Sequence, residues 1–241
     1  MQIFAKSDIG RERQANEDSF YVSTDSDSIN LFILADGMGG YNGGEVASKL
    51  AVESVKEYVY KNFDFNVLTH DSILSLLKAA LIYANKQVYD RSISKKSLRG
   101  MGTTLDVCLI IKNKLYMAHI GDSRIYRLRK NYLRLLTKDH SYVEQLIEDG
   151  EISEEEAEHH PERNKLTKAL GCMPNIEPDA GYKNFQKEDI ILMCSDGLTK
   201  MLNEEEIKNI IQEDIETSAE NLVEKANDNG GYDNITVIIV K

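Results

Sequence analysis

The order of strand-like and helix-like segments restricts the fold of this 241-residue chain more than any other feature of its sequence. Three short apolar segments typical of strands come first, at residues 2–6, 19–23 and 30–35. Two long stretches then carry apolar stripes at helical spacing, one from Ala47 and the other from Ile73. Four more strand-like segments follow and predict an antiparallel meander, at residues 103–111, 114–120, 124–128 and 132–136. Because strands and helices occur in blocks, the sequence favours an α+β layered sandwich over a doubly wound sheet.

The second half of the chain adds short helices and two more strands. Ser141 and Glu144 predict a capped helix that ends near Asp149, and the residues 151–174 that follow are polar and irregular. A strand, two capped helices and a last strand complete the chain, at 190–194, from near Asn203, from near Thr217 and at 235–240. No repeat or linker divides the sequence, so we expect one domain over residues 1–241.

The charge balance excludes some classes of function. The chain has 40 acidic and 29 basic residues, a formal net charge of −11. Nucleic-acid binding needs a basic surface, so this class is disfavoured. No apolar run approaches the roughly 18 residues of a membrane span, and the first ten residues lack the shape of a signal peptide, so we expect no membrane association. Three scattered cysteines fit a reducing compartment, which predicts a cytoplasmic protein.

Three aspartates stand next to apolar segments in a way that suggests ligand binding. Asp36 and Asp196 each follow an apolar strand and precede a glycine, while Asp233 comes just before the last strand. A carboxylate at the end of a strand is held by a rigid sheet and still reaches solvent, and glycines let ligands approach the backbone. Hard cations such as Mg²⁺ and Mn²⁺ prefer oxygen ligands of this kind.

A common turn is the simpler explanation for any one of these sites, because Asp-Gly is a frequent turn sequence. Two further acidic loops, Asn16-Glu17-Asp18 and Gly121-Asp122-Ser123-Arg124, join the three aspartates. So many acidic loops in one domain are harder to explain as separate turns. Together they predict a shared cation site.

These loops belong to a series of motifs that resembles the bacterial branch of the type 2C (PPM) family of metal-dependent Ser/Thr protein phosphatases. One motif alone would be weak, but the series occurs in the family's order along essentially the whole chain. Its members are Ser7-Asp8-Ile9-Gly10-Arg11-Glu12-Arg13-Gln14-Ala15-Asn16-Glu17-Asp18, Asp36-Gly37-Met38-Gly39-Gly40, Gly44-Glu45-Val46-Ala47-Ser48, Gly100-Met101-Gly102-Thr103-Thr104, Gly121-Asp122-Ser123-Arg124, Asp139-His140-Ser141, Ser195-Asp196-Gly197 and Asp233-Asn234-Ile235-Thr236.

The resemblance implies a set of metal ligands. Asp36 would bridge two ions, Mn²⁺ or Mg²⁺, with the carbonyl of Gly37 on the first ion. Asp196 and Asp233 would hold the second ion. Asp122 would join Asp196 at a third, more weakly bound ion.

The resemblance also implies supporting residues and a fold. Glu17 and Asp18 would orient metal-bound waters, and Arg13 would bind the substrate phosphate. A guanidinium can clamp two phosphate oxygens at once, although Arg13 taken alone is better explained as a surface arginine in a charged loop. The implied fold is a four-layer αββα sandwich, with two antiparallel sheets face to face and helices outside. Residues 151–174 correspond in order to the family's flap.

A pair of divalent cations explains hydrolysis without a protein nucleophile. Two ions about 3.5–4 Å apart can share a water, lower its pKa and neutralise the phosphoryl oxygens. The chain has no Cys-x5-Arg loop and no Gly-x-Ser-x-Gly elbow that would supply a nucleophile. We therefore expect a monomeric enzyme that hydrolyses phosphoserine and phosphothreonine on proteins and opposes a cognate Ser/Thr kinase.

Two other functions remain as alternatives. A two-metal phosphodiesterase or nuclease also uses clustered carboxylates, but the acidic balance and the missing basic track argue against it. A non-catalytic phosphopeptide-binding member of the family would be expected to lose metal aspartates, and all of them are present here.

Some positions depart from the family pattern. Family members often carry a histidine near the glycine turn, where this chain has Met38 and Tyr41. The sequence therefore does not identify the general acid that protonates the leaving oxygen. A metal-bound water or His140 could serve, and a structural role for His140 is as good an explanation. Acidic residues crowd the segment 154–158, which is either a solvated helix face or an acidic lid.

Overall fold

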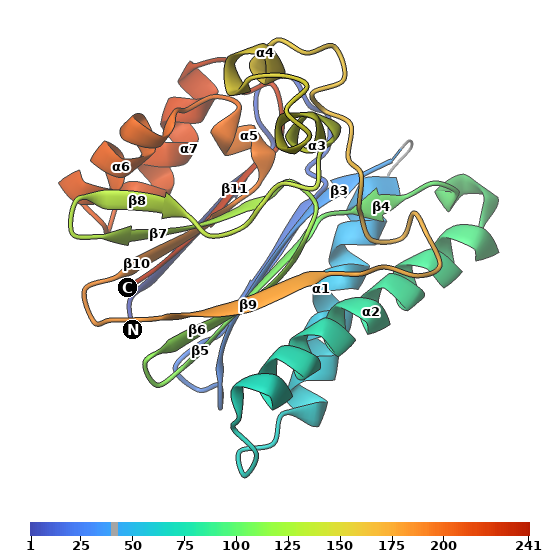
Figure 1. Cartoon of the computed structure of the whole chain (residues 1–241), viewed down its shortest axis with the longest axis vertical. Helices are drawn as coiled ribbons and strands as arrows, with labels where there is room; N and C mark the ends of the chain where they lie inside the picture. Colours follow the sequence, from blue (N-terminus) through green and yellow to red (C-terminus); the bar gives the residue numbers. More distant parts are fainter. Residues whose placement is uncertain (40–42) are drawn as a thin grey trace.

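The computed structural model describes residues 1–39 and 43–241, and its strands form two antiparallel sheets (Figure 1). The first sheet has the order β1-β11-β10-β7-β8, at Ile3–Asp8, Ile235–Val240, Ile190–Cys194, Arg124–Arg129 and Tyr132–Leu135. The second sheet has the order β2-β3-β5-β6-β9, at Asp18–Val22, Asn30–Met38, Leu105–Ile111, Lys114–Ile120 and Asp179–Asn184. The short strand β4, at Gly102–Thr103, pairs with β3.

Helices cover the outer face of each sheet (Figure 1). The long helices α1 and α2, at Gly43–Asn62 and His70–Ser94, cover the second sheet. The first sheet is covered by α5, α6 and α7, at Asp196–Thr199, Glu204–Glu213 and Ser218–Asp228. Two short helices, α3 at Tyr142–Glu148 and α4 at Glu154–Glu158, lie outside these layers, and a 3₁₀ turn at Lys96–Leu98 follows α2. The predicted α+β sandwich of four layers is confirmed.

Alternation along the strands produces three separate cores. In β3, Leu31 and Ile33 pack against the helices, while Phe32 and Leu34 point into the space between the sheets. Successive side chains of a strand point to opposite faces, so a strand buried on both faces reads as a continuous apolar run. The inner strand β11 is apolar except for Thr236 for the same reason, and all six of its residues are buried.

The predicted meander is wrong at one connection. Strands β6 and β7 follow each other in the sequence but lie in different sheets, because β6 pairs with β5 and β9 whereas β7 pairs with β8 and β10. The chain changes sheets at Gly121, where φ is +114°, a conformation that glycine adopts readily. A strand exposes the same apolar alternation in either sheet, so the sequence pattern could not distinguish the two arrangements.

Other local predictions can be compared with the structure. Ser141 caps α3 as predicted, and Ser153 caps α4; each side chain accepts a backbone hydrogen bond. Asp36 does not end its strand, since β3 continues to Met38. None of the helices in the described ranges is both long and apolar enough to cross a membrane.

Candidate active site

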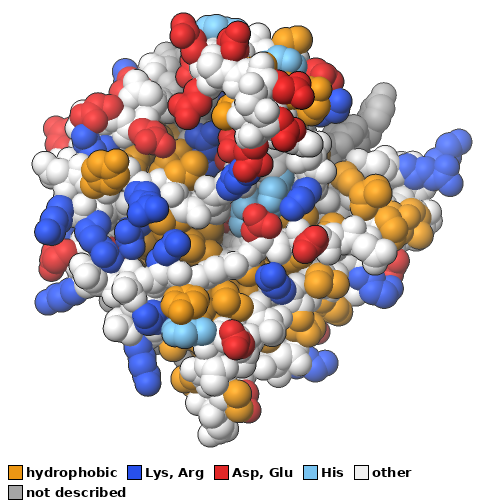
Figure 2. All heavy atoms as spheres, in the orientation of Figure 1, with side chains coloured by type: hydrophobic (Ala, Val, Ile, Leu, Met, Phe, Trp, Pro, Cys, Tyr) orange, Lys and Arg blue, Asp and Glu red, His pale blue; other side chains and the backbone are white. Residues whose placement is uncertain are grey.

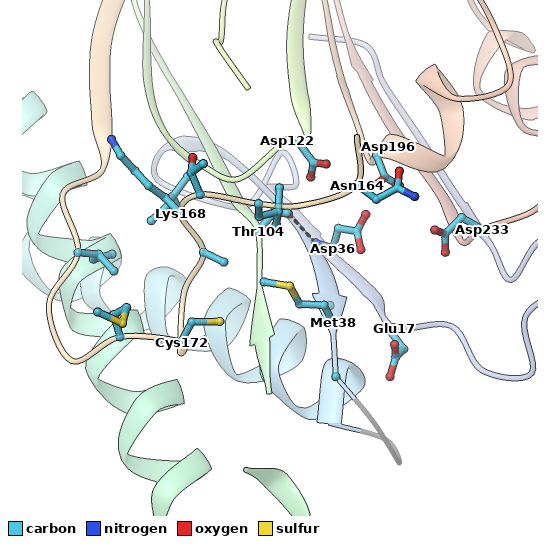
Figure 3. A pocket seen from close by; sticks show the side chains of 18 of the residues that line it. Glu17, Asp36, Met38, Thr104, Asp122, Asn164, Lys168, Cys172, Asp196 and Asp233 are labelled. Carbon is cyan, nitrogen blue, oxygen red and sulfur yellow. Dashed lines mark hydrogen bonds between the residues drawn. The ribbon is translucent and has the colours of Figure 1, made fainter. Parts of the chain in front are cut away.

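Four aspartates from four distant segments meet at one cavity of about 630 Å³ (Figure 3). Asp36 lies in β3, and Asp122 lies in the turn between β6 and β7. Asp196 begins α5 directly after β10, and Asp233 lies two residues before β11. The predicted residues Arg13, Glu17 and Gly37 line the same cavity. Thus the structure brings together the predicted metal ligands.

Asp18 is buried behind these aspartates and is not one of the lining residues. It stands opposite Asp36 in the register of β2 and β3, and Ser195 Oγ donates a hydrogen bond of 2.8 Å to Asp18 Oδ2. Asp18 Oδ1 is buried without a hydrogen-bond partner among the described residues. Its place beside Asp36 fits the expectation that it acts on water rather than directly on an ion.

Like charges and burial set the protonation of the cluster. Burial raises the pKa of Asp36 well above its usual range, and the nearby charges of Asp18, Asp196, Asp122 and Asp233 raise it further. Burial also raises the pKa of Asp18 to about 7 and that of Asp122 to about 7. Such a cluster is stable with its carboxylates ionised only when cations neutralise it.

The oxygen ligands fit hard divalent cations. Asp196 Oδ1 is a buried atom with no hydrogen-bond partner in the described part of the chain, which leaves it free to bind a cation. No three His, Cys, Asp or Glu side chains in residues 1–39 and 43–241 are already grouped around one point as a metal site. Mg²⁺ usually keeps several of its waters when it binds a protein, so one or two carboxylates are enough to hold it.

Two basic side chains neutralise part of the cluster. Arg13 Nη2 donates a hydrogen bond of 2.8 Å to Asp233 Oδ2. Lys200 forms an ion pair with Asp196, and its Nζ lies 3.8 Å from Asp233 Oδ2. Although burial acts to lower the pKa of Lys200, the surrounding carboxylates outweigh it and raise that pKa. The sequence analysis did not identify Lys200. Its position four residues after Asp196 could have indicated the contact, because residues four apart on a helix are neighbours.

Asn234 connects the N-terminal loop to the last strand, and sequence reasoning gave it no role. Its Oδ1 accepts a hydrogen bond of 2.8 Å from the backbone N–H of Glu17. Its Nδ2 donates bonds of 2.9 Å to the carbonyls of Ile9 and Ala15. These three bonds hold the segment that carries Arg13 against the loop that carries Asp233. In the sequence, Asn234 stands out only as a member of the motif Asp233-Asn234-Ile235-Thr236.

Glu17 lies against the start of α1. A Cβ atom on Gly44 would come within 2.7 Å of Glu17 Oε2, so the carboxylate occupies the space that glycine leaves. Burial raises the pKa of Glu17, while the amides of Gly44 and Glu45 act in the opposite direction. Gly37 is equally confined, because a Cβ there would meet the carbonyl oxygens of Gly44 and Glu17 at 2.2 and 2.5 Å.

His140 has a structural position. Its Nδ1 accepts a hydrogen bond of 3.1 Å from the backbone N–H of Gly121, and its ring stacks on His119 with centroids 4.8 Å apart. Burial lowers the pKa of His140 to about 4, and the nearby His119 acts in the same direction. His140 therefore holds the turn that carries Asp122, and it does not line the cavity. Tyr41 lies outside the described residues.

The predicted flap contributes to the cavity with its second half only. Asn164, Leu166, Thr167, Lys168, Ala169, Cys172 and Met173 line the cavity. Backbone hydrogen bonds join this stretch to the segment that precedes the flap, from Tyr142 N–H to Lys165 O and from Thr167 N–H to His140 O. The acidic residues of α4 do not line the cavity. Helix α4 lies near the top of Figure 1, and its Glu154, Glu155 and Glu158 are exposed. Acidic side chains gather at the top of the face shown in Figure 2.

The chain is similar to known phosphatases over its whole length. Residues 9–228 match the family model described as "Protein phosphatase 2C". The Serine/threonine phosphatase stp of Listeria welshimeri is 41% identical over 238 residues, which cover 98% of this chain and 94% of that protein.

Solved structures show the same similarity. The Mycobacterium tuberculosis serine/threonine phosphatase PstP/Ppp has a TM-score of 0.89 and 37% identity, covering 99% of this chain and 97% of its own. A structure of the catalytic domain of serine threonine protein phosphatase PstP in complex with two manganese ions has a TM-score of 0.86 and 36% identity, and the match covers 99% and 96% of the two chains.

Proposed function

Because the chain belongs to the type 2C family of metal-dependent Ser/Thr protein phosphatases, we propose that its clustered aspartates hold the ions for hydrolysis of phosphoserine and phosphothreonine. The observation that supports this most is the meeting of Asp36, Asp122, Asp196 and Asp233 at one cavity. The relatives named above are all phosphatases, so neither the nuclease nor the binding-module alternative is favoured.

The metal ligands can be assigned individually. Asp36 and the carbonyl of Gly37 would hold one ion, and Asp36 with Asp196 and Asp233 would hold the other. Asp122 and Asp196 would form a third, weaker site. When bound, Mn²⁺ or Mg²⁺ supplies a Lewis acid for the phosphoryl oxygens and an activated water. Both metals accept the same oxygen ligands, so either ion would fit this set.

The remaining residues of the site position substrate and water. Arg13 would bind the phosphate, moving from Asp233, with which it pairs at 2.8 Å, to the more highly charged phosphoryl group. Asp18 is fixed by Ser195 and would accept a hydrogen bond from a water near Asp36. Glu17 would do the same from the start of α1. No histidine lines the cavity in the described ranges, so we propose that water supplies the proton for the leaving oxygen.

We also propose the wider setting. The chain would act as one catalytic domain over residues 1–241, as a monomer in the cytoplasm, with residues 151–174 as its flap. Phosphorylated proteins are its substrates, and a cognate Ser/Thr kinase would be its natural opponent. The scattered free cysteines Cys108, Cys172 and Cys194 fit a reducing compartment.

The direct test is turnover of a phosphothreonine peptide with and without metal. We expect phosphate release with Mn²⁺ or Mg²⁺, none after chelation by EDTA, and recovery when metal is added back. Release of phosphate at an undiminished rate in excess EDTA would contradict the metal-dependent mechanism. Cleavage of DNA but not of phosphopeptide would favour the nuclease.

Arg13→Ala should raise KM by about tenfold or more and lower kcat less, because a phosphate clamp mainly supplies binding that is already present in the ground state. Arg13→Lys should restore only part of the affinity, since a lysine lacks the two-pronged guanidinium. Steady-state kinetics on a phosphopeptide provide the measurement. Arg11→Ala is the matched control, because Arg11 is exposed in the same loop and does not line the cavity. Unchanged kinetics for Arg13→Ala would return Arg13 to the role of a surface arginine.

A further inference from the structure

The cavity continues well beyond the aspartates. Its volume of about 630 Å³ lies in the range of about 300–1,000 Å³ that is usual for pockets that enclose whole ligands. The carboxylates line one side of the cavity, and apolar side chains line the other side. Figure 3 shows Met38 and Cys172 on the side away from Asp233. We call this second side the apolar arm, formed by Met38, Leu166, Ala169, Cys172, Met173 and Ile176.

One wall of the apolar arm is fixed to α2 by a buried side chain. Asn85 of α2 is only 1% exposed. Its Oδ1 accepts a hydrogen bond of 2.8 Å from the backbone N–H of Gly171. Its Nδ2 donates bonds of 3.0 and 3.2 Å to the carbonyls of Met173 and Pro174. A buried amide with all these bonds made holds the loop in one conformation, so the wall is preformed.

Glycines bring this loop close to its neighbours. At Gly171, φ is +80° and a Cβ atom would meet Val88 Cγ1 at 2.4 Å, so the loop lies directly on α2. At Gly102, a Cβ atom would meet Cys172 Sγ at 2.7 Å and Met38 Cε at 3.1 Å. The side chains of Cys172 and Met38 thus pack side by side over Gly102 and join the wall to the floor beside Asp36.

The apolar arm is accessible from outside. Met173 is 62% exposed, an unusual state for a large apolar side chain whose backbone is anchored so firmly. The charged residues that line the cavity near the arm in sequence, Lys168 and Glu177, have opposite signs. The arm therefore selects by apolar contact rather than by a net charge.

We propose that the apolar arm binds an aliphatic side chain of the substrate protein, within a few residues of the phosphorylated Ser or Thr. This inference rests on the proposed function, because the phosphate must lie at the aspartates and the peptide must then continue along the same cavity. An extended peptide advances about 3.3–3.6 Å per residue, so neighbouring side chains reach past the metal centre. Cys172, Met173 and Met38 determine this specificity, and Asn85 is a positioning residue.

The test compares two phosphothreonine peptides that differ only in leucines or serines at the positions flanking the phosphothreonine. For the wild-type enzyme with Mn²⁺, we expect kcat/KM to be about tenfold higher for the leucine peptide, a typical discrimination by an apolar pocket. In Met173→Ser this ratio should fall towards one. The control Ile93→Ser should keep the ratio, because Ile93 is exposed on α2 and does not line the cavity.

Asn85→Ala should reduce the ratio as well, through a higher KM for the leucine peptide at a nearly unchanged kcat. Equal turnover of both peptides by the wild type, or a ratio that Met173→Ser leaves unchanged, would overturn the inference and leave the phosphatase function intact. A preference for acidic or basic flanking residues would overturn it as well. Failure of the wild type with Mn²⁺ to hydrolyse either peptide would overturn the proposed function together with this specificity.

Discussion

Asp36→Asn should lower kcat on a phosphopeptide by at least about 10²-fold while the chain keeps its fold. Asparagine has the shape of aspartate and can keep the place of Asp36 in β3. It removes the negative charge at the centre of the cluster, where burial first and four other carboxylates second raise the pKa of Asp36. Fewer like charges should leave the metal-free protein at least as stable as the wild type, so the loss of activity would not reflect unfolding.

Three measurements separate these effects: kcat, the amount of Mn²⁺ retained after dialysis, and the melting temperature by circular dichroism. We expect Asp36→Asn to retain less Mn²⁺ than the wild type and to melt no earlier in EDTA. The control Asp25→Asn changes the same charge in an exposed turn and should alter none of them. Near-normal turnover by Asp36→Asn, with its metal content reduced, would refute the assignment of Asp36 as the central ligand.

The aspartates of this site could be predicted from the sequence because each stands next to a segment that is apolar on both faces. Residues 31–35 are a continuous apolar run and residues 235–240 are apolar except for Thr236, as expected for strands buried between two layers. Such a run fixes the position of Asp36 or Asp233 at the edge of the buried part. The sequence pattern and the burial agree at these two strands, so the places of Asp36 and Asp233 could be predicted, while their role as metal ligands stays a prediction.

Contacts between distant segments could not be predicted in this way. Asn234 binds the carbonyl of Ile9 across 225 residues of sequence, and no periodicity records such a pair. Asn85 of α2 likewise reaches Met173 across 88 residues. In the sequence Asn85 is one polar residue in a long helix, and only the fold shows that it faces a loop.

Short or edge elements were also missed for physical reasons. Strand β9, at Asp179–Asn184, pairs with β6 alone and has four of its six residues exposed, so it lacks the apolar alternation of the inner strands. Helix α5, at Asp196–Thr199, is a single turn and carries no periodic stripe. Lys200 follows α5 directly, which explains why its contact with Asp196 was not foreseen.

Without metal, the protein should become less stable as the pH rises from about 4 to about 7. Burial first, and like charges second, raise the pKa of Asp18 and Asp122 to about 7, from a usual value of 3.8. Between these two values the folded chain binds more protons than the unfolded chain, so each increase in pH favours unfolding. The protein loses no stability from these two groups below about pH 4, and the loss is complete above about pH 7.

Metal ions should reverse this trend, because they replace the protons that the carboxylates give up. At a Mn²⁺ concentration about 100 times its dissociation constant, binding adds about 2.7 kcal/mol, or roughly 5–11 °C in melting temperature for a chain of this length. We therefore expect the gap in melting temperature between Mn²⁺-loaded and EDTA-treated protein to widen from about pH 5 to about pH 8. Asp122→Asn should weaken the pH dependence in EDTA, since it removes one of the two carboxyls that titrate near pH 7. A metal-free melting temperature that rises through the same window would show that the aspartates are not crowded as described.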